Sequence, residues 1–174
     1  MGLKIVKYDK VPEVGYLEYI KEWELSGEKI VPMASERRSE SFGDLLAKWS
    51  TDETDEVYKK GFVPAALYFL VDKKKVLGAI HFRHELNDSL LYNGGHIGYG
   101  IRPSERKKGY ATKMLVMLLD LVRTKKYKKV LVTCDENNTG SARTIENAKG
   151  ILYDKIELEG ETTLRYWITL DSRE

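Results

Sequence analysis

The chain has 174 residues, a length typical of one domain, and its 29 basic and 27 acidic residues give a net charge of +2. Nearly balanced charge argues against a protein that holds a polyanion by bulk charge. No apolar run approaches the roughly 18 residues of a membrane-spanning helix, and the first ten residues lack a signal-peptide core. Cys134 is the only cysteine, which excludes an intrachain disulfide. We therefore expect a soluble, cytoplasmic protein.

The first 60 residues are predicted to form one strand and two helices. A short apolar stretch favours a strand over 3–6, and apolar spacing predicts a helix over about 13–25. The second helix covers 42–50. Ser41 is its expected N-cap, and Asp44 lies at the position that completes a capping box. The polar residues 51–60 indicate a surface loop.

Strands and helices alternate after residue 60. Strands are predicted over 66–71, 76–85, 96–101, 130–134, 152–158 and 164–170. Helices are predicted over 109–124 and 138–149, a loop over 87–95, and a hairpin turn at Glu159-Gly160. This order predicts an α/β (α+β) fold, a single domain over 1–174 with a mixed, mostly antiparallel central sheet flanked by helices.

The helix over 109–124 begins with the wrong charge. Its first residues follow Arg106, Lys107 and Lys108, although a helix N-terminus is itself partly positive and normally attracts Asp or Glu. Free backbone N–H groups beside basic side chains are what a phosphate or pyrophosphate needs, and Gly109 would let such a ligand approach the backbone. The alternative is three solvated cations in front of a helix.

The stretch from His96 to Ala111 reads HIGYGIRPSERKKGYA and resembles the core of the GNAT acetyltransferases. That family's pyrophosphate loop follows the pattern Arg/Gln-x-x-Gly-x-Gly/Ala, and Arg106, Gly109 and Ala111 fill it. The Ile-Arg-Pro at 101–103 resembles the end of the family's splayed central strand, and 138–141 resembles its Asn-x-x-Ser/Ala. The wording is similar to that of a group of uncharacterised predicted acetyltransferases within the family.

The resemblance implies a GNAT fold and an acetyl-CoA-dependent N-acetyltransferase. The acceptor would be a primary amine of a small molecule, peptide or protein. Ile101 would pair its backbone with the pantetheine arm, and Asn138 and Ser141 would contact the pantetheine or the adenosine side. The pyrophosphate would be held by backbone N–H groups of Arg106, Lys107, Lys108, Gly109, Tyr110, Ala111 and Thr112. Acetyl-CoA is the expected cosubstrate, with no metal, and family members are often homodimers.

Acetyl transfer to an amine needs a proton acceptor and a proton donor. Deprotonating a lysine-like amine at pH 7 costs about 4.6 kcal/mol, so a general base or a water relay is expected. Glu85 and His96, with His84 beside them, are candidates that would converge if their strands pair as a hairpin. The alternatives are a structural, hydrogen-bonded role for His96, and for Glu85 a solvated carboxylate at the strand end or a partner of Arg83. Many GNAT enzymes carry a tyrosine acid seven residues after the Asn, but Ile145 occupies that position here.

Other functions stay open on the sequence. The missing tyrosine favours a non-catalytic acyl-CoA-binding protein, a sensor or partner subunit, as the first alternative. The run Lys125–Lys129 suggests a nucleic-acid patch, but cations are favourable after a helix C-terminus, so we interpret it as a solvated loop and expect no nucleic-acid or membrane partner. Cys134 lies in an apolar strand without a nearby histidine, which indicates a buried, inert thiol. The three histidines have no metal-ligand spacing.

Overall fold

The computed structural model describes residues 2–125 and 127–170. Its strands form a seven-stranded sheet in the order β1-β2-β3-β4-β5-β7-β6, and only β4 and β5 pair in parallel. The strands are β1 (Lys4–Lys7), β2 (Ala65–Asp72), β3 (Lys75–Arg83), β4 (Ile97–Ile101), β5 (Lys129–Asp135), β6 (Ile151–Leu158) and β7 (Glu161–Thr169). The α-helices are α1 (Glu13–Ser26), α2 (Phe42–Thr51), α3 (Asp88–Tyr92), α4 (Tyr110–Arg123) and α5 (Thr139–Asn147).

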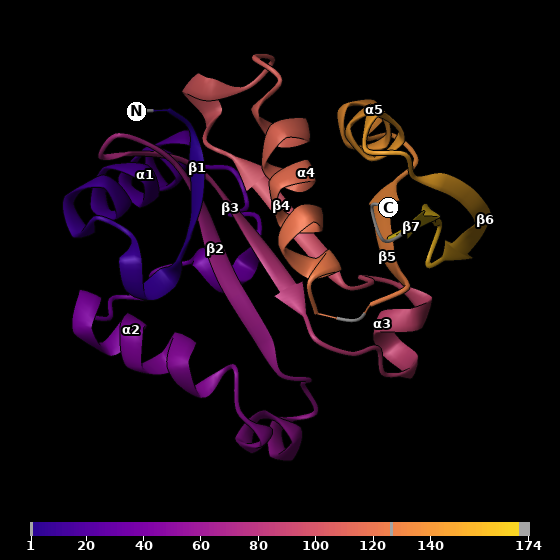
Figure 1. Ribbon diagram of the computed structural model, residues 1–174, viewed down its shortest axis with the longest axis horizontal. Helices are drawn as coiled ribbons and strands as arrows, with labels where there is room; N and C mark the ends of the chain where they lie inside the picture. The colour runs from indigo at the N-terminus through magenta and orange to yellow at the C-terminus, as the bar shows by residue number, and fades with distance from the viewer. Residues whose placement is uncertain (1, 126, 171–174) are drawn as a thin grey trace.

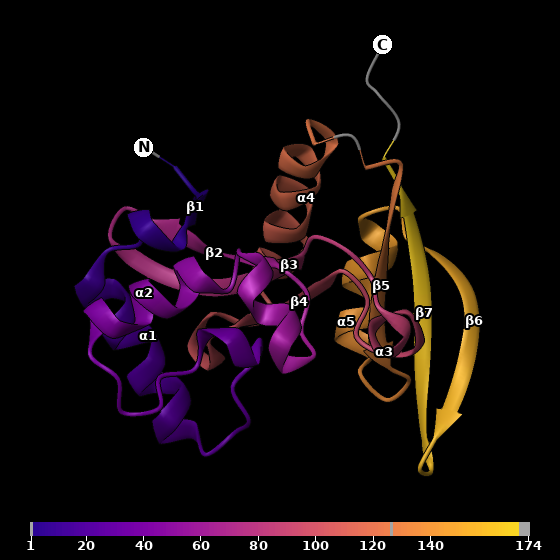
Figure 2. The same cartoon turned by 90° about the horizontal axis from the view of Figure 1, so that it is seen from below.

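Helices cover both faces of the sheet (Figures 1 and 2). One apolar cluster joins α1 and α2 to β2 and β3, and it contains the buried rings of Tyr16, Tyr19, Trp49 and Phe69. The second cluster joins α4 and α5 to β3, β4, β5 and β7. Figure 1 shows α4 lying between the β1–β4 half and the β5–β7 half of the molecule. The predicted mixed, mostly antiparallel sheet with flanking helices is confirmed.

Local sequence signals explain several element boundaries. Ser41 and Asp44 form the predicted capping box at the start of α2. Residues 159 and 160 both have positive φ and turn β6 into β7, as the hairpin prediction required. Two loop predictions are wrong: 55–60 forms a 3-10 helix, and 88–92 forms α3. The side chain of Asn87 caps α3 by accepting the Leu90 N–H at 2.9 Å.

The third strand is shorter than predicted. β3 ends at Arg83, whose N–H still donates to β4; the His84 N–H points to the opposite edge and donates to the carbonyl of Pro64, next to β2, at 2.8 Å. The expectation that Glu85 lies within this strand is therefore wrong, because the chain has left the β3–β4 ladder by that point. Within the described part of the chain, none of the helices is long and apolar enough to cross a membrane.

Candidate active site

The two central strands separate from each other. The parallel pairing of β4 with β5 is recorded only at Ile97 and Val132, so the strands diverge toward Ile101. The pairing of β4 with β3 uses alternate residues: the carbonyl of His96 accepts the Arg83 N–H at 2.7 Å, and the Arg102 N–H donates to Leu77 at 2.9 Å. Backbone groups alternate between the two edges of a strand. Those of the intervening residue Tyr99 therefore face the opening, where an extended ligand can pair with them.

No side chain of the described residues caps the N-terminus of α4. Gly109 is its N-cap at φ +77°, with no side-chain cap and no acidic residue in the first turn. The helices α2, α3 and α5 are capped by the side chains of Ser41, Asn87 and Asn138, and α1 begins with an acid. The start of α4 thus presents free N–H groups and the positive end of the helix dipole, which favour a bound anion.

The cations before α4 are partly neutralised by acids. Arg106 pairs with Glu28 at 2.8 Å, stacks 4.9 Å from the ring of Trp23, and donates through Nε to the carbonyl of Ile101 at 3.2 Å. Lys108 pairs with Glu105 at 2.9 Å. The Arg106 side chain therefore points toward α1. The groups that the loop presents at the start of α4 are therefore backbone N–H groups. The carbonyl of Ile101 already accepts a hydrogen bond, from Nε of Arg106.

The first turn of α5 reaches across the opening to β4. The Asn138 side chain accepts the Ser141 N–H at 3.0 Å, and the Ser141 hydroxyl lies 2.7 Å from the hydroxyl of Tyr99. Burial raises the pKa of Tyr99 to about 12, so this phenol is a proton donor at neutral pH. Sequence reasoning missed Tyr99. The available signal was strand alternation, which puts its side chain on the same face of β4 as Ile97 and Ile101.

Two other residues near α5 that the sequence analysis discussed, Cys134 and Ile145, are buried in the core. Ile145 is fully buried, in the apolar cluster shared by α4 and α5. Cys134 is 8% exposed, and burial raises the pKa of its thiol to about 11, as the inert-thiol interpretation requires.

His96 joins the two central strands at the closed end of the opening. The side-chain Nδ1 of His96 accepts the backbone N–H of Leu131 at 2.9 Å. The backbone N–H of His96 donates to the carbonyl of Leu131 at 2.8 Å. Burial, and then the nearby Arg83, lower the pKa of His96 to about 4, so the imidazole is neutral at pH 7. Because Nδ1 accepts a hydrogen bond, the neutral ring carries its single proton on Nε2, which is therefore a donor.

Glu85 lies beyond β3 and is exposed. It contacts the hydroxyl of Tyr58, and this carboxylate raises the pKa of Tyr58 to about 12. The β3–β4 hairpin brings Arg83 opposite His96, but no contact joins Glu85 to His96 among the described residues. Both side chains stand near the same end of the hairpin without forming a pair.

The loop between α1 and α2 covers the other face of β4. Tyr16 donates to the carbonyl of Ser35 at 2.8 Å, and the indole of Trp49 donates to that of Ala34, also at 2.8 Å. These bonds hold the loop so close that a Cβ on Gly100 would lie 2.1 Å from the carbonyl oxygen of Val31. The opening between β4 and β5 is thus bounded on this face by a fixed wall.

The family model of the acetyltransferase (GNAT) domain matches residues 9–150. The chain belongs to the GNAT acetyltransferase family. The predicted family and enzyme class, an acetyl-CoA-dependent acyltransferase, are confirmed by this match. No curated protein sequence matches the chain.

Solved structures of low sequence identity share the fold. The ribosomal-protein-S5-alanine acetyltransferase from Vibrio fischeri superposes with a TM-score of 0.64 at 15% identity, covering 97% of this chain and 92% of that one. A putative acetyltransferase from Salmonella typhimurium, solved with its cofactor acetyl-CoA, gives 0.62 at 13% identity, covering 99% and 96%. Mutant forms of a spermidine/spermine N-acetyltransferase from Vibrio cholerae give 0.61 at 15% identity, covering 97% and 95%.

The basic run 125–129 and the histidines were the other features that the sequence analysis weighed as possible sites. Of the basic run 125–129, Lys126 lies outside the described residues, and the ammonium of Lys129 packs 4.2 Å from the ring of Trp167. In the ranges 2–125 and 127–170, no group of three or more His, Cys, Asp or Glu side chains is placed to hold a metal ion.

Proposed function

We propose that this protein transfers the acetyl group of acetyl-CoA to a primary amine on a small molecule, peptide or protein. One observation carries the proposal: the free edge of β4 leads directly into the uncapped N-terminus of α4. An extended arm followed by a pyrophosphate has the shape and charge that such a path selects. The family match supports the same cosubstrate.

Each end of the cosubstrate would meet different backbone groups. The pyrophosphate would accept hydrogen bonds from the backbone N–H groups at the start of α4, where no side chain caps the helix. These belong to Gly109, Tyr110, Ala111 and Thr112. The pantetheine arm would add to the free edge of β4 at Tyr99 and the Ile101 N–H, as a strand adds to a sheet. Lys107, which is exposed, adds positive charge beside this path.

The reaction needs three groups on the protein. A backbone N–H on the free edge of β4 would donate to the thioester oxygen, where negative charge develops as the amine attacks. Glu85 would take the amine proton directly or through water, and the Nε2–H of His96 would donate to that water and orient it. The departing thiolate would take its proton from the Tyr99–Ser141 hydroxyl pair, which lies across the opening, since Ile145 offers no acid.

The acceptor is proposed only as a class. The relatives of known fold include one named for alanine of a ribosomal protein and another named for spermidine and spermine. All of these acceptors are amines, and they share little else. We therefore propose primary amines as the acceptor class.

Calorimetric titration with acetyl-CoA, followed by a thiol-release screen across amine classes, tests the proposal. Micromolar binding with thiol release for one class supports it and names the acceptor type. Binding without release from any class favours the alternative that the buried Ile145 suggests, a non-catalytic acyl-CoA-binding protein. Absence of binding refutes the cosubstrate assignment. For the base, Glu85→Ala and His96→Ala variants that both keep wild-type kcat/KM would exclude the two candidates.

A further inference from the structure

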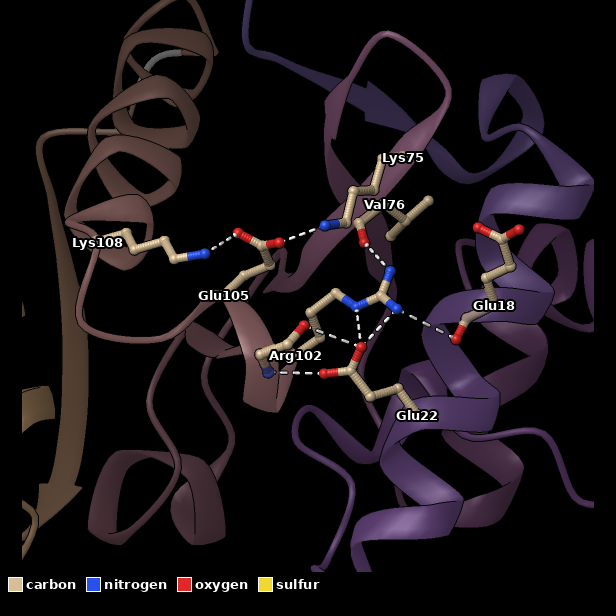
Figure 3. Close-up of polar contacts among 8 residues, drawn as sticks. Glu18, Glu22, Lys75, Val76, Arg102, Glu105 and Lys108 are labelled. Atoms are coloured by element: carbon tan, nitrogen blue, oxygen red, sulfur yellow. Dashed lines mark hydrogen bonds and ion pairs between the residues drawn. The ribbon is translucent and has the colours of Figure 1, made fainter.

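The turn between β4 and α4 is held by one helix, α1. Arg102 and Ser104 both contact the carboxylate of Glu22 (Figure 3). Arg106 reaches Trp23 and the residue Glu28 just beyond the helix. These contacts join residues about 80 positions apart in the sequence. Arg102, Ser104 and Arg106, every second residue of the turn, therefore contact α1 or the residues just after it.

Glu22 makes the densest of these contacts. Its carboxylate accepts Arg102 Nε at 2.6 Å, the Ser104 N–H at 2.7 Å and the Ser104 hydroxyl at 3.0 Å. Burial opposes the charged form, but the bonds from Ser104 and Arg102 outweigh it, so the pKa of Glu22 lies below its ordinary value. The carboxylate thus stays charged and acts as a cap for the 3-10 turn Pro103–Glu105, supplied from a distant helix.

The charge of Glu22 is matched to a buried cation. Arg102 is 8% exposed, and its other nitrogens donate to the carbonyls of Val76 and Glu18 at 3.1 Å and 3.5 Å. Carbonyls supply no formal charge, so Glu22 is the anion paired with this guanidinium. Figure 3 shows the carboxylate of Glu18, one turn earlier on α1, pointing away from the network.

The next part of the loop depends on this support. Glu105 is 8% exposed and pairs with both Lys75 on β3 and Lys108. Beyond it, Lys107 and Gly109 have positive φ, and α4 has no cap of its own. The position of the N–H groups at the start of α4 is therefore set by contacts to α1 and β3.

We propose that Glu22 is a positioning residue for the nucleotide end of acetyl-CoA, an inference that rests on the proposed function. The two ends of the binding path are held separately, since the β3 ladder fixes β4 while Glu22 fixes the turn that leads to α4. Hydrogen bonds to charged groups are among the stronger ones in proteins, so displacing the donors at the start of α4 should lower affinity for an anion by about 10- to 100-fold. Loss of Glu22 should therefore weaken binding of the pyrophosphate and leave that of the pantetheine arm unchanged.

The test compares CoA with pantetheine, which lacks the nucleotide. We expect Glu22→Gln to raise the Kd of CoA by about 10- to 100-fold and to change that of pantetheine by less than about 2-fold. Glu18→Gln, on the same helix, should leave both unchanged. Amide hydrogen exchange gives an independent readout, because exchange at Ser104 should accelerate in Glu22→Gln and stay at the wild-type rate in Glu18→Gln.

Because Glu22→Gln leaves the Arg102 cation unpaired, a second variant guards against misfolding. The double change Glu22→Met with Arg102→Met removes both charges and retains apolar packing. It should show the same selective loss of CoA affinity.

Two results would overturn the inference alone: unchanged CoA affinity in the folded variants, or an equal loss for CoA and pantetheine, which indicates a merely structural role. If the wild-type protein fails to bind CoA, the proposed function is refuted, and this inference with it.

Discussion

Substituting Gly109 tests whether a pyrophosphate lies at the start of α4. At φ +77° an L-residue is strained by about 1–2 kcal/mol, but a Cβ at this position would meet no atom within 4 Å. A carboxylate at a helix N-terminus returns about 0.3–1 kcal/mol. We therefore expect Gly109→Glu to fold with nearly wild-type stability.

The effect on binding is electrostatic and can be sized. A carboxylate about 4 Å from a phosphoryl charge is repelled by about 4 kcal/mol at an effective dielectric of 20, and by about half of that where water enters. CoA affinity should then fall by about 30- to 1,000-fold. Gly109→Gln is the matched control, because it has the same backbone strain and nearly the same size without the charge.

Calorimetric titration of CoA into the three proteins measures the difference. The reasoning predicts that Gly109→Glu binds at least about 30-fold more weakly than Gly109→Gln. If the two folded variants bind CoA within about 3-fold of each other, no phosphoryl group lies beside residue 109 and the assignment of the loop is refuted.

Three further predictions concern the wall, the histidines and the proton donor. Gly100→Ala should destabilise the protein by about 1–3 kcal/mol in chemical unfolding, because the new Cβ would lie 2.1 Å from the Val31 carbonyl oxygen. Gly98→Ala should be tolerated, because the nearest atom to its Cβ belongs to the flexible Arg83 side chain at 3.5 Å. Equal effects of the two substitutions would contradict the close approach at Gly100. The free energy of unfolding should fall by about 2–4 kcal/mol between pH 7.5 and pH 5. Burial lowers the pKa of His81 to about 3 and that of His96 to about 4, so these two histidines take up protons below about pH 6.5 in the unfolded chain and stay neutral in the folded one. A free energy of unfolding that does not change over this pH range would refute the argument. Tyr99→Phe should lower kcat by about 10- to 100-fold while the Kd of acetyl-CoA stays within about 2-fold, and an unchanged kcat would remove Tyr99 as the donor.

The sequence predicted the parts of the site that depend on neighbouring residues. Apolar spacing located α4, and the three basic residues before it led to the proposal of an anion site, because the helix dipole acts over the first turn alone. The capping box at Ser41 and the cap at Asn138 are likewise local contacts. Such features can be read from a few consecutive residues.

The parts that were missed depend on distant residues. Glu28 reaches Arg106 across 78 positions, and Ser141 reaches Tyr99 across 42, so no local pattern shows either contact. The end of β3 was also misplaced by two residues, since β3 ends at Arg83 and no glycine or proline follows it before Gly94 to mark that end. Tertiary hydrogen bonding decides these positions, and local propensity does not report it.

The most direct test of the central claim is an amide chemical-shift titration of the isotopically labelled protein with CoA. We predict that the largest shifts occur at the amides of Gly109, Tyr110, Ala111 and Thr112, followed by that of Tyr99 on β4. Pantetheine should shift Tyr99 and leave the amides of α4 in place. Saturable binding of CoA with its largest shifts elsewhere on the protein would contradict the claim.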